Sequence, residues 1–79
     1  MARVLLFGRL ADVAGWRERA VAADSLSALR AALTNADAAL GEALAGPGVQ
    51  AAVDKTITRG EARLTAASEV AFLPPMSGG

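Results

Sequence analysis

Residues 69–79 read Glu-Val-Ala-Phe-Leu-Pro-Pro-Met-Ser-Gly-Gly, and this stretch indicates how the fold ends and where a tail begins. Its first part predicts a final β-strand, in which alternating side chains place Val70 and Phe72 on one face. The two prolines then end the strand, because a proline has no N–H to donate to a sheet. We therefore expect a domain over residues 1–73 and an extended, flexible C-terminal tail over residues 74–79.

The middle of the chain predicts one main helix over residues 26–35. Leu26, Leu29 and Leu33 recur at spacings of i, i+3 and i+7, which places the three side chains on one apolar stripe. A shorter helical piece follows, and Gly46-Pro47-Gly48 then interrupts the regular structure. The stripe indicates that the main helix covers a hydrophobic core.

Strand-like segments occupy most of the remaining chain. Alternating or wholly apolar patterns predict strands over residues 3–9, 18–23, 49–53, 56–59 and 69–73. The residues 10–14 predict a short additional helix. This order, with the main helix between the second and third strands, predicts an α+β fold. We expect a ubiquitin-like β-grasp roll, with a mixed sheet of about five strands and one main helix packed on one face.

The composition excludes several kinds of site. The 79 residues contain no Cys and no His, which excludes thiolate and imidazole nucleophiles and any metal site built from these ligands. We expect no bound metal. The basic and acidic residues balance to a net charge of zero, so there is no basic field for nucleic acid. The apolar run Val4–Phe7 is too short for a signal peptide or a membrane span, and we expect a cytoplasmic protein that does not contact a membrane.

The tail ends in the group for which the sequence predicts reactive chemistry, the α-carboxylate of Gly79. Gly78 and Gly79 have no side chains, so the end of the tail could enter a narrow tunnel in another protein. The α-carboxylate of Gly79 is ionised near neutral pH. Its attack on ATP would give a mixed anhydride, which can accept sulfur or pass the chain to a thiol or an amine. The residues alone leave open a second interpretation, a frayed end without a function.

Residues 69–79 resemble the C-terminal signature of the small, sulfur-carrier subunit of molybdopterin synthase, the MoaD family of ubiquitin-like β-grasp proteins. The resemblance continues through the opening strand and short helix, the main helix and the middle strand, at residues 4–15, 25–33 and 51–54. The Phe-x-Pro-Pro-x-Ser-Gly-Gly ending is its specific part. Asp54 replaces a common Asn, and residues 66–68 replace an Asp-Gly type of turn, so neither turn has a glycine for a positive φ.

The resemblance implies a cycle of sulfur transfer. An adenylyltransferase similar to ubiquitin-activating enzymes uses ATP to adenylate Gly79, and a sulfur-transfer system then forms a thiocarboxylate. The large synthase subunit receives the tail in its active site, namely Pro74, Pro75, Met76 and Ser77, and Gly78 and Gly79 are the catalytic residues at its end. There the thiocarboxylate donates sulfur to cyclic pyranopterin monophosphate. The resemblance also implies a heterotetramer with the large subunit, catalytic groups mainly on that subunit, and no cofactor bound by this chain.

One face of the sheet is expected to remain uncovered, because a single helix shields only the other face. Phe7, Ile57 and Leu73 are predicted to form an apolar docking patch for partners on this open face. The alternative is that the three are ordinary core residues and that the predicted strand register is off by one.

Two other functions stay open. A sulfur carrier for thiamin or cysteine synthesis, or a ubiquitin-like modifier, shares the fold and the Gly-Gly end but not typically the Phe-x-Pro-Pro ending. A non-catalytic, protein-binding β-grasp module would carry the Gly-Gly end without using it.

Overall fold

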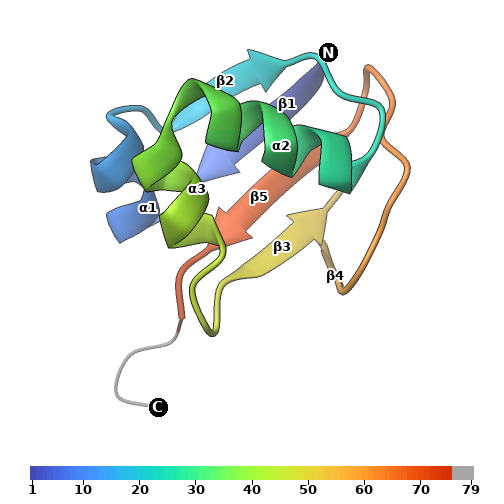
Figure 1. The fold of residues 1–79 in the computed structure, drawn as a ribbon. Coiled ribbons are helices and arrows are strands. Elements are labelled where there is room, and N and C mark those ends of the chain that lie inside the picture. The colour runs from blue at the N-terminus through green and yellow to red at the C-terminus, as the bar shows by residue number, and fades with distance from the viewer. Residues whose placement is uncertain (76–79) are drawn as a thin grey trace.

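The final strand, β5 (Glu69–Leu73), lies at the centre of a five-stranded sheet. The computed structural model describes residues 1–75 and orders the strands β2-β1-β5-β3-β4 (Figure 1). The other strands are β1 (Ala2–Leu6), β2 (Glu18–Val21), β3 (Gln50–Val53) and β4 (Thr56–Thr58). β5 runs parallel to β1 and antiparallel to β3, and the two edge strands pair antiparallel with their neighbours. The predicted α+β fold with a mixed sheet is confirmed.

The helices lie on one side of the sheet, with α2 crossing it (Figure 1). They are α1 (Arg9–Ala14), α2 (Leu26–Ala36) and α3 (Ala38–Leu44). Ser25 caps α2, since its hydroxyl oxygen accepts a hydrogen bond from the N–H of Ala28 at 3.1 Å. Asp37 caps α3 in the same way through the N–H of Leu40. The extended backbone of Asp37 separates α2 from α3, as the two helical patterns in the sequence predict.

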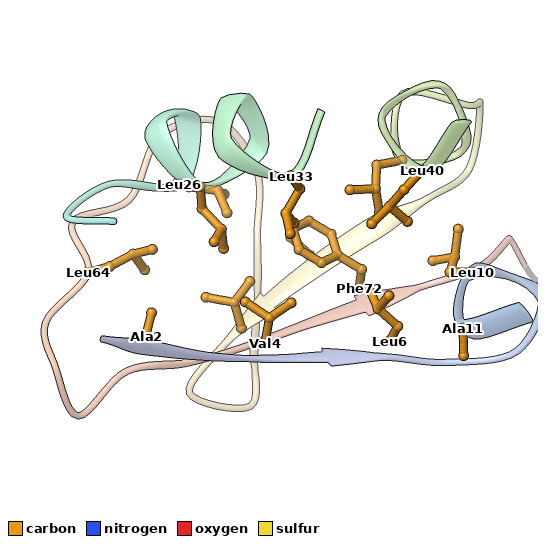
Figure 2. Packing of buried hydrophobic residues seen from close by; sticks show 14 residues of the cluster. Ala2, Val4, Leu6, Leu10, Ala11, Leu26, Leu33, Leu40, Leu64 and Phe72 are labelled. Carbon is orange, nitrogen blue, oxygen red and sulfur yellow. The ribbon is translucent and has the colours of Figure 1, made fainter. Parts of the chain in front are cut away.

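The core lies between the sheet and these helices. Val4 and Phe72 point from β1 and β5 towards the helices (Figure 2). Val70 lies on the same face of β5 as Phe72, and all three side chains are fully buried. The leucines of α2 and α3 belong to the same buried cluster as these strand residues. They are Leu26, Leu29, Leu33, Leu40 and Leu44. Leu64, from the loop between β4 and β5, closes one end of this core. The predicted strand register is therefore confirmed for β1 and β5, because alternation along each strand puts these side chains on the covered face.

The first strand is shorter than the sequence predicts. We expected it to reach residue 9, but it ends at Leu6, because Gly8 has a φ of +57° and α1 begins at Arg9. The N–H of Phe7 still donates to the Phe72 carbonyl at 3.3 Å, so the chain follows β5 for one residue beyond the strand. The other predicted elements agree with the structure to within two residues at each end.

The two turns without glycine are built in different ways. Asp54 and Lys55 both adopt a positive φ, of 49° and 71°, and so form the tight turn between β3 and β4. The Asp54 carboxylate accepts a hydrogen bond from the N–H of Glu69 at 2.9 Å, which ties this turn to the start of β5. The turn before β5 needs no positive φ, since the N–H of Ser68 donates to the Thr65 carbonyl and the Ser68 hydroxyl accepts from the N–H of Thr65.

Candidate functional site

The tail leaves the domain at one end of the sheet. β1 runs parallel to β5 and β3 runs antiparallel to it, so the loop after β1 and the loop before β3 both lie at the end where β5 stops. Pro74 is half-buried there and Pro75 is exposed. The other predicted tail residues, Met76, Ser77, Gly78 and Gly79, lie outside the described residues. The division of the chain at residue 73 stays a prediction.

An apolar row crosses the face of the sheet that points away from the helices. The strand register places Leu5 beside Ala71, Ala71 beside Ala52, and Ala52 beside Ile57. Neighbours in register share a face, and this face is opposite to that of the fully buried Val4. The two central members are alanines, so the middle of the row is formed by methyl groups alone. We call these four side chains the open-face row.

The three residues of the predicted docking patch lie on or beside this row. Ile57 ends the row on the edge strand β4 and is 45% exposed, and Phe7 follows β1 and is 46% exposed. Leu73 lies two residues after Ala71 on the same face and is half-buried. Leu5 and Phe7 line a common surface cavity of about 300 Å³. The structure therefore exposes large apolar groups here, and partner binding by them stays a prediction.

Charged side chains border the open-face row. The Arg3 guanidinium pairs with the Glu18 carboxylate, and Arg3 also lies beside Glu69 in the register. The hydrogen bond from Arg3 to Glu18 is the main cause that raises the pKa of the arginine above its ordinary value. Both groups are largely exposed. The open face is thus apolar along its centre, with an ion pair at its β2 side.

The described part of the chain contains neither a candidate metal site nor a candidate membrane span. Within residues 1–75, the structure brings together no group of three or more acidic residues that could hold a metal ion. The same part of the chain has no helix with the length and apolar character needed to span a membrane.

The strand order and the helix layer define the class of protein. A mixed sheet with the last strand at its centre and the helices on one face is a ubiquitin-like β-grasp fold, and solved structures agree. SAMP1 from Haloferax volcanii is similar, with a TM-score of 0.81 and 28% identity, over 99% of this chain and 98% of that chain. The small archaeal modifier protein 1 from Methanosarcina acetivorans gives a TM-score of 0.85 at 22% identity, over 99% of this chain and 95% of that chain.

The sequence model of the ThiS family matches residues 4–79, and the chain belongs to this family. This result confirms the predicted membership of the ubiquitin-like sulfur carriers. A comparison with curated proteins finds no match. The fold shared with the two modifier proteins also confirms the predicted β-grasp class.

Sequence reasoning missed part of the site. The open-face row includes Ala52, which the sequence did not place there, because an alanine in a short strand gives no sign of which face it occupies. The pairing of Ala52 with Ala71 and Ile57 depends on the register between strands that are distant in sequence. The close approach of two loop glycines to Pro74 and Pro75 was missed for the same reason.

Proposed function

We propose that this protein is the sulfur carrier of molybdopterin synthase, with the C-terminal carboxylate of Gly79 as its reactive group. The observation that carries the proposal is the Phe-x-Pro-Pro-x-Ser-Gly-Gly ending, which begins at Phe72 in the central strand of a ThiS-family domain and continues to Gly79. In this proposal the domain presents the tail and partner enzymes act on it.

The cycle has three steps. A carboxylate oxygen of Gly79 attacks the α-phosphorus of ATP, pyrophosphate leaves, and a mixed anhydride forms. A sulfide equivalent then attacks the carbonyl carbon and AMP leaves, so that a thiocarboxylate remains. Finally the thiocarboxylate sulfur attacks a carbon of cyclic pyranopterin monophosphate and displaces an oxygen leaving group. Water then hydrolyses the resulting thioester, so that the sulfur stays on the substrate and the Gly79 carboxylate is regenerated. Two such donations supply the dithiolene sulfurs of molybdopterin. The mixed anhydride supplies AMP as the leaving group for the second step, and the thiocarboxylate supplies the sulfur for the third.

The composition supports a division of roles between two chains. This chain has no His and no Cys to act as an acid, a base or a nucleophile near neutral pH. The acid and base groups of the last step would therefore come from the large subunit, in a heterotetramer with two copies of each chain. ATP would be bound by the adenylyltransferase and not by this chain.

The open face supports a role in docking to these partners. Phe7 and Ile57 keep nearly half of their surface exposed in a domain whose other large apolar side chains are mostly buried. Leu73 connects this face to Pro74, the first residue of the tail. A partner that covers the open face would thus hold the start of the tail at the same time. Aromatic side chains are enriched at protein interfaces, and contiguous exposed apolar patches mark interaction sites.

A second candidate is a ubiquitin-like protein modifier. The observation that favours it is the likeness to the small archaeal modifier protein 1 over nearly the whole chain. In that function the mixed anhydride of Gly79 would react with an amine of another protein, and an amide bond would form as AMP leaves. A carrier for thiamin or cysteine synthesis would share the thiocarboxylate and differ in the acceptor of sulfur.

Intact-mass spectrometry after co-expression with an adenylyltransferase tests the proposal. With ATP and a sulfur donor present, we expect a mass gain equal to the exchange of one oxygen for one sulfur in the C-terminal peptide. A matched variant with one residue added after Gly79 should show no gain, because its α-carboxylate lies one residue further out. An unchanged mass of the parent chain would show that it is not a sulfur carrier.

The acceptor distinguishes the candidates. The thiocarboxylate form is mixed with the large subunit and cyclic pyranopterin monophosphate, and formation of the dithiolene product is expected. Amide-linked adducts of this chain with other proteins, in place of that product, would favour the modifier. A third outcome would favour a plain binding module. In that case the parent chain gains no mass, and the variant with one residue added after Gly79 still binds the partner.

A further inference from the structure

Two glycines contact the first two residues of the tail. Gly8 lies in the loop after β1 and Gly48 in the loop before β3, with φ values of +57° and +82°. A methyl group placed on Gly8 would lie 3.0 Å from the Pro74 Cγ atom, and one placed on Gly48 would lie 2.7 Å from the Pro75 Cβ atom. Both loops thus need a residue without a side chain where the chain leaves the sheet.

The arrangement follows from the sheet order. β1 and β3 flank β5 on either side, so their loops at the tail end enclose the point where β5 stops (Figure 1). Proline holds φ near −65° and its ring is rigid, so neither ring can turn aside as a flexible side chain would. We call Gly8 and Gly48, with the two prolines between their loops, the proline seat.

Two other glycines show that positive φ alone does not explain this site. Gly15 and Gly60 have φ values of +82° and +81°, nearly the same as that of Gly48, yet no atom lies within 4 Å of a methyl group placed on either. A substitution at Gly60 therefore introduces only backbone strain, whereas one at Gly48 introduces the same strain and a collision with Pro75. The chain thus supplies its own matched control.

We propose that the proline seat fixes the direction in which the chain leaves the domain at Pro75, and so sets the point from which the Gly79 carboxylate is presented to the enzyme that acts on it. This inference rests on the proposed function as a tail donor. Gly8 and Gly48 contact Pro74 and Pro75, so they are positioning residues. They would act by setting where the reactive end begins its path into the partner.

The surroundings indicate how the seat would respond to substitution. Pro75 lines a surface cavity of about 310 Å³ together with Arg9 and Glu42. The Pro75 ring moves only with its backbone, so a methyl group at Gly48 would displace the whole residue, and the cavity gives it room to move without entering the core. We expect Gly48→Ala to redirect the tail while the domain stays folded, with thermal unfolding close to that of Gly60→Ala.

The first measurement is a distance that does not depend on activity. The chain has no cysteine, so Met76→Cys and Asn35→Cys introduce two unique sites for spin labels, one just after Pro75 and one on α2. Pulsed electron resonance should give the same distance distribution for the parent and for Gly60→Ala, and a shifted or broader one for Gly48→Ala. Identical distributions in all three proteins would overturn the seat.

The second measurement is the rate of thiocarboxylate formation, on chains that keep Met76 and Asn35. A misplacement of about 1 Å can cost a reaction up to about a hundredfold, and we expect kcat to fall about tenfold in Gly48→Ala. KM should stay unchanged, since the open face is intact, and Gly60→Ala should stay within about twofold of the parent. Equal kcat values for both variants would overturn the positioning role, as would a loss of kcat without any change in the measured distance.

Two outcomes call for a further experiment. If the parent chain forms no thiocarboxylate, the proposed function is wrong, and the distance measurement alone then decides whether the seat directs the tail. If Gly48→Ala does not fold, Pro75→Gly is added to it, which removes the Pro75 Cβ atom that the new methyl group would meet at 2.7 Å. Recovery of folding in this double variant supports the contact on which the seat depends, and failure to recover folding overturns it.

Discussion

The two faces of the sheet are both apolar, yet the chain covers only one of them. On the covered face, Val4, Val70 and Phe72 are fully buried under the helices. On the other face, Leu5 and Leu73 are half-buried and Ile57 is 45% exposed. The covered face gives the free energy of folding, since burial of apolar surface is the main favourable term. The open face contributes less to folding, so its apolar side chains are available for a partner.

The largest expected effect separates the two faces by stability. Phe72→Ala removes a fully buried ring and should lower the free energy of unfolding by about 3–5 kcal/mol, much of what a small domain has. Leu5→Ala, on the neighbouring strand but the open face, should cost about 1 kcal/mol. Urea denaturation of both variants measures the difference. Similar losses would mean that the open face is also part of the folding core.

The next effect concerns binding. Ile57→Glu places a charge in the open-face row and should weaken binding to the adenylyltransferase or the large subunit by about 2 kcal/mol, roughly thirtyfold. The free energy of unfolding should change by less than about 1 kcal/mol, because the side chain is 45% exposed and lies on an edge strand. Calorimetric titration measures the affinity.

The neighbouring residue supplies the control for this prediction. Thr56 is also exposed on β4, but its register with Val53 and Val70 places it on the helix side of the sheet. Thr56→Glu adds the same charge one residue away and should leave the affinity nearly unchanged. Equal losses of affinity in the two variants would show that net charge, and not the open face, controls binding.

A smaller effect is expected at the turn between β3 and β4, which serves the fold alone. Asp54→Ala loses the hydrogen bond to the N–H of Glu69 and keeps a positive φ, so the free energy of unfolding should fall by about 1–2 kcal/mol. Lys55→Gly removes the cost of a positive φ at a residue with a side chain, and should raise the free energy of unfolding by about 0.5 kcal/mol. Thermal unfolding checks both signs. Partner affinity should not change in either variant, and a change would contradict the separation of roles.

The smallest effect depends on pH. Hydrogen bonds from the hydroxyl and N–H groups of Ser27 to the Glu61 carboxylate lower the pKa of that group. A carboxyl whose pKa is lower in the folded state stabilises the fold above its unfolded pKa, near 4.3, and this contribution disappears as the pH falls through the folded pKa. Glu61→Gln should therefore lower the melting temperature slightly at neutral pH and not at strongly acidic pH. A constant difference at all pH values would mean that ionisation of Glu61 does not matter.

The sequence predicted the parts of this fold that depend on local patterns. The leucine spacing in α2 and the alternation in β5 are properties of neighbouring residues, and both elements lie where they were expected. The predicted first strand was too long at its end because Gly8 takes a positive φ that the apolar run before it does not reveal. The Asp54-Lys55 turn has positive φ values without glycine, since a hydrogen bond from a distant residue, Glu69, stabilises it.

The candidate site was predictable only in part. The tail motif and the exposed Phe7 and Ile57 follow from residue type and from the order of the elements. The proline seat could not be predicted from the sequence, because it brings the loop after β1 and the loop before β3 into contact with the residues that follow β5. The tie between Glu61 and Ser27 spans 34 residues and has no local signal either. Contacts of this kind become visible only when the topology is known.

The central place of β5 has a consequence for how the protein is made. β1 and β2 pair with each other, and β3 and β4 pair with each other, but β5 alone joins the two hairpins into one sheet. A chain that stops before residue 69 would therefore hold two unjoined strand pairs with exposed edges, which can pair with other chains. The five-stranded sheet is complete only after β5 has been translated, so a domain with this sheet already carries the base of the tail.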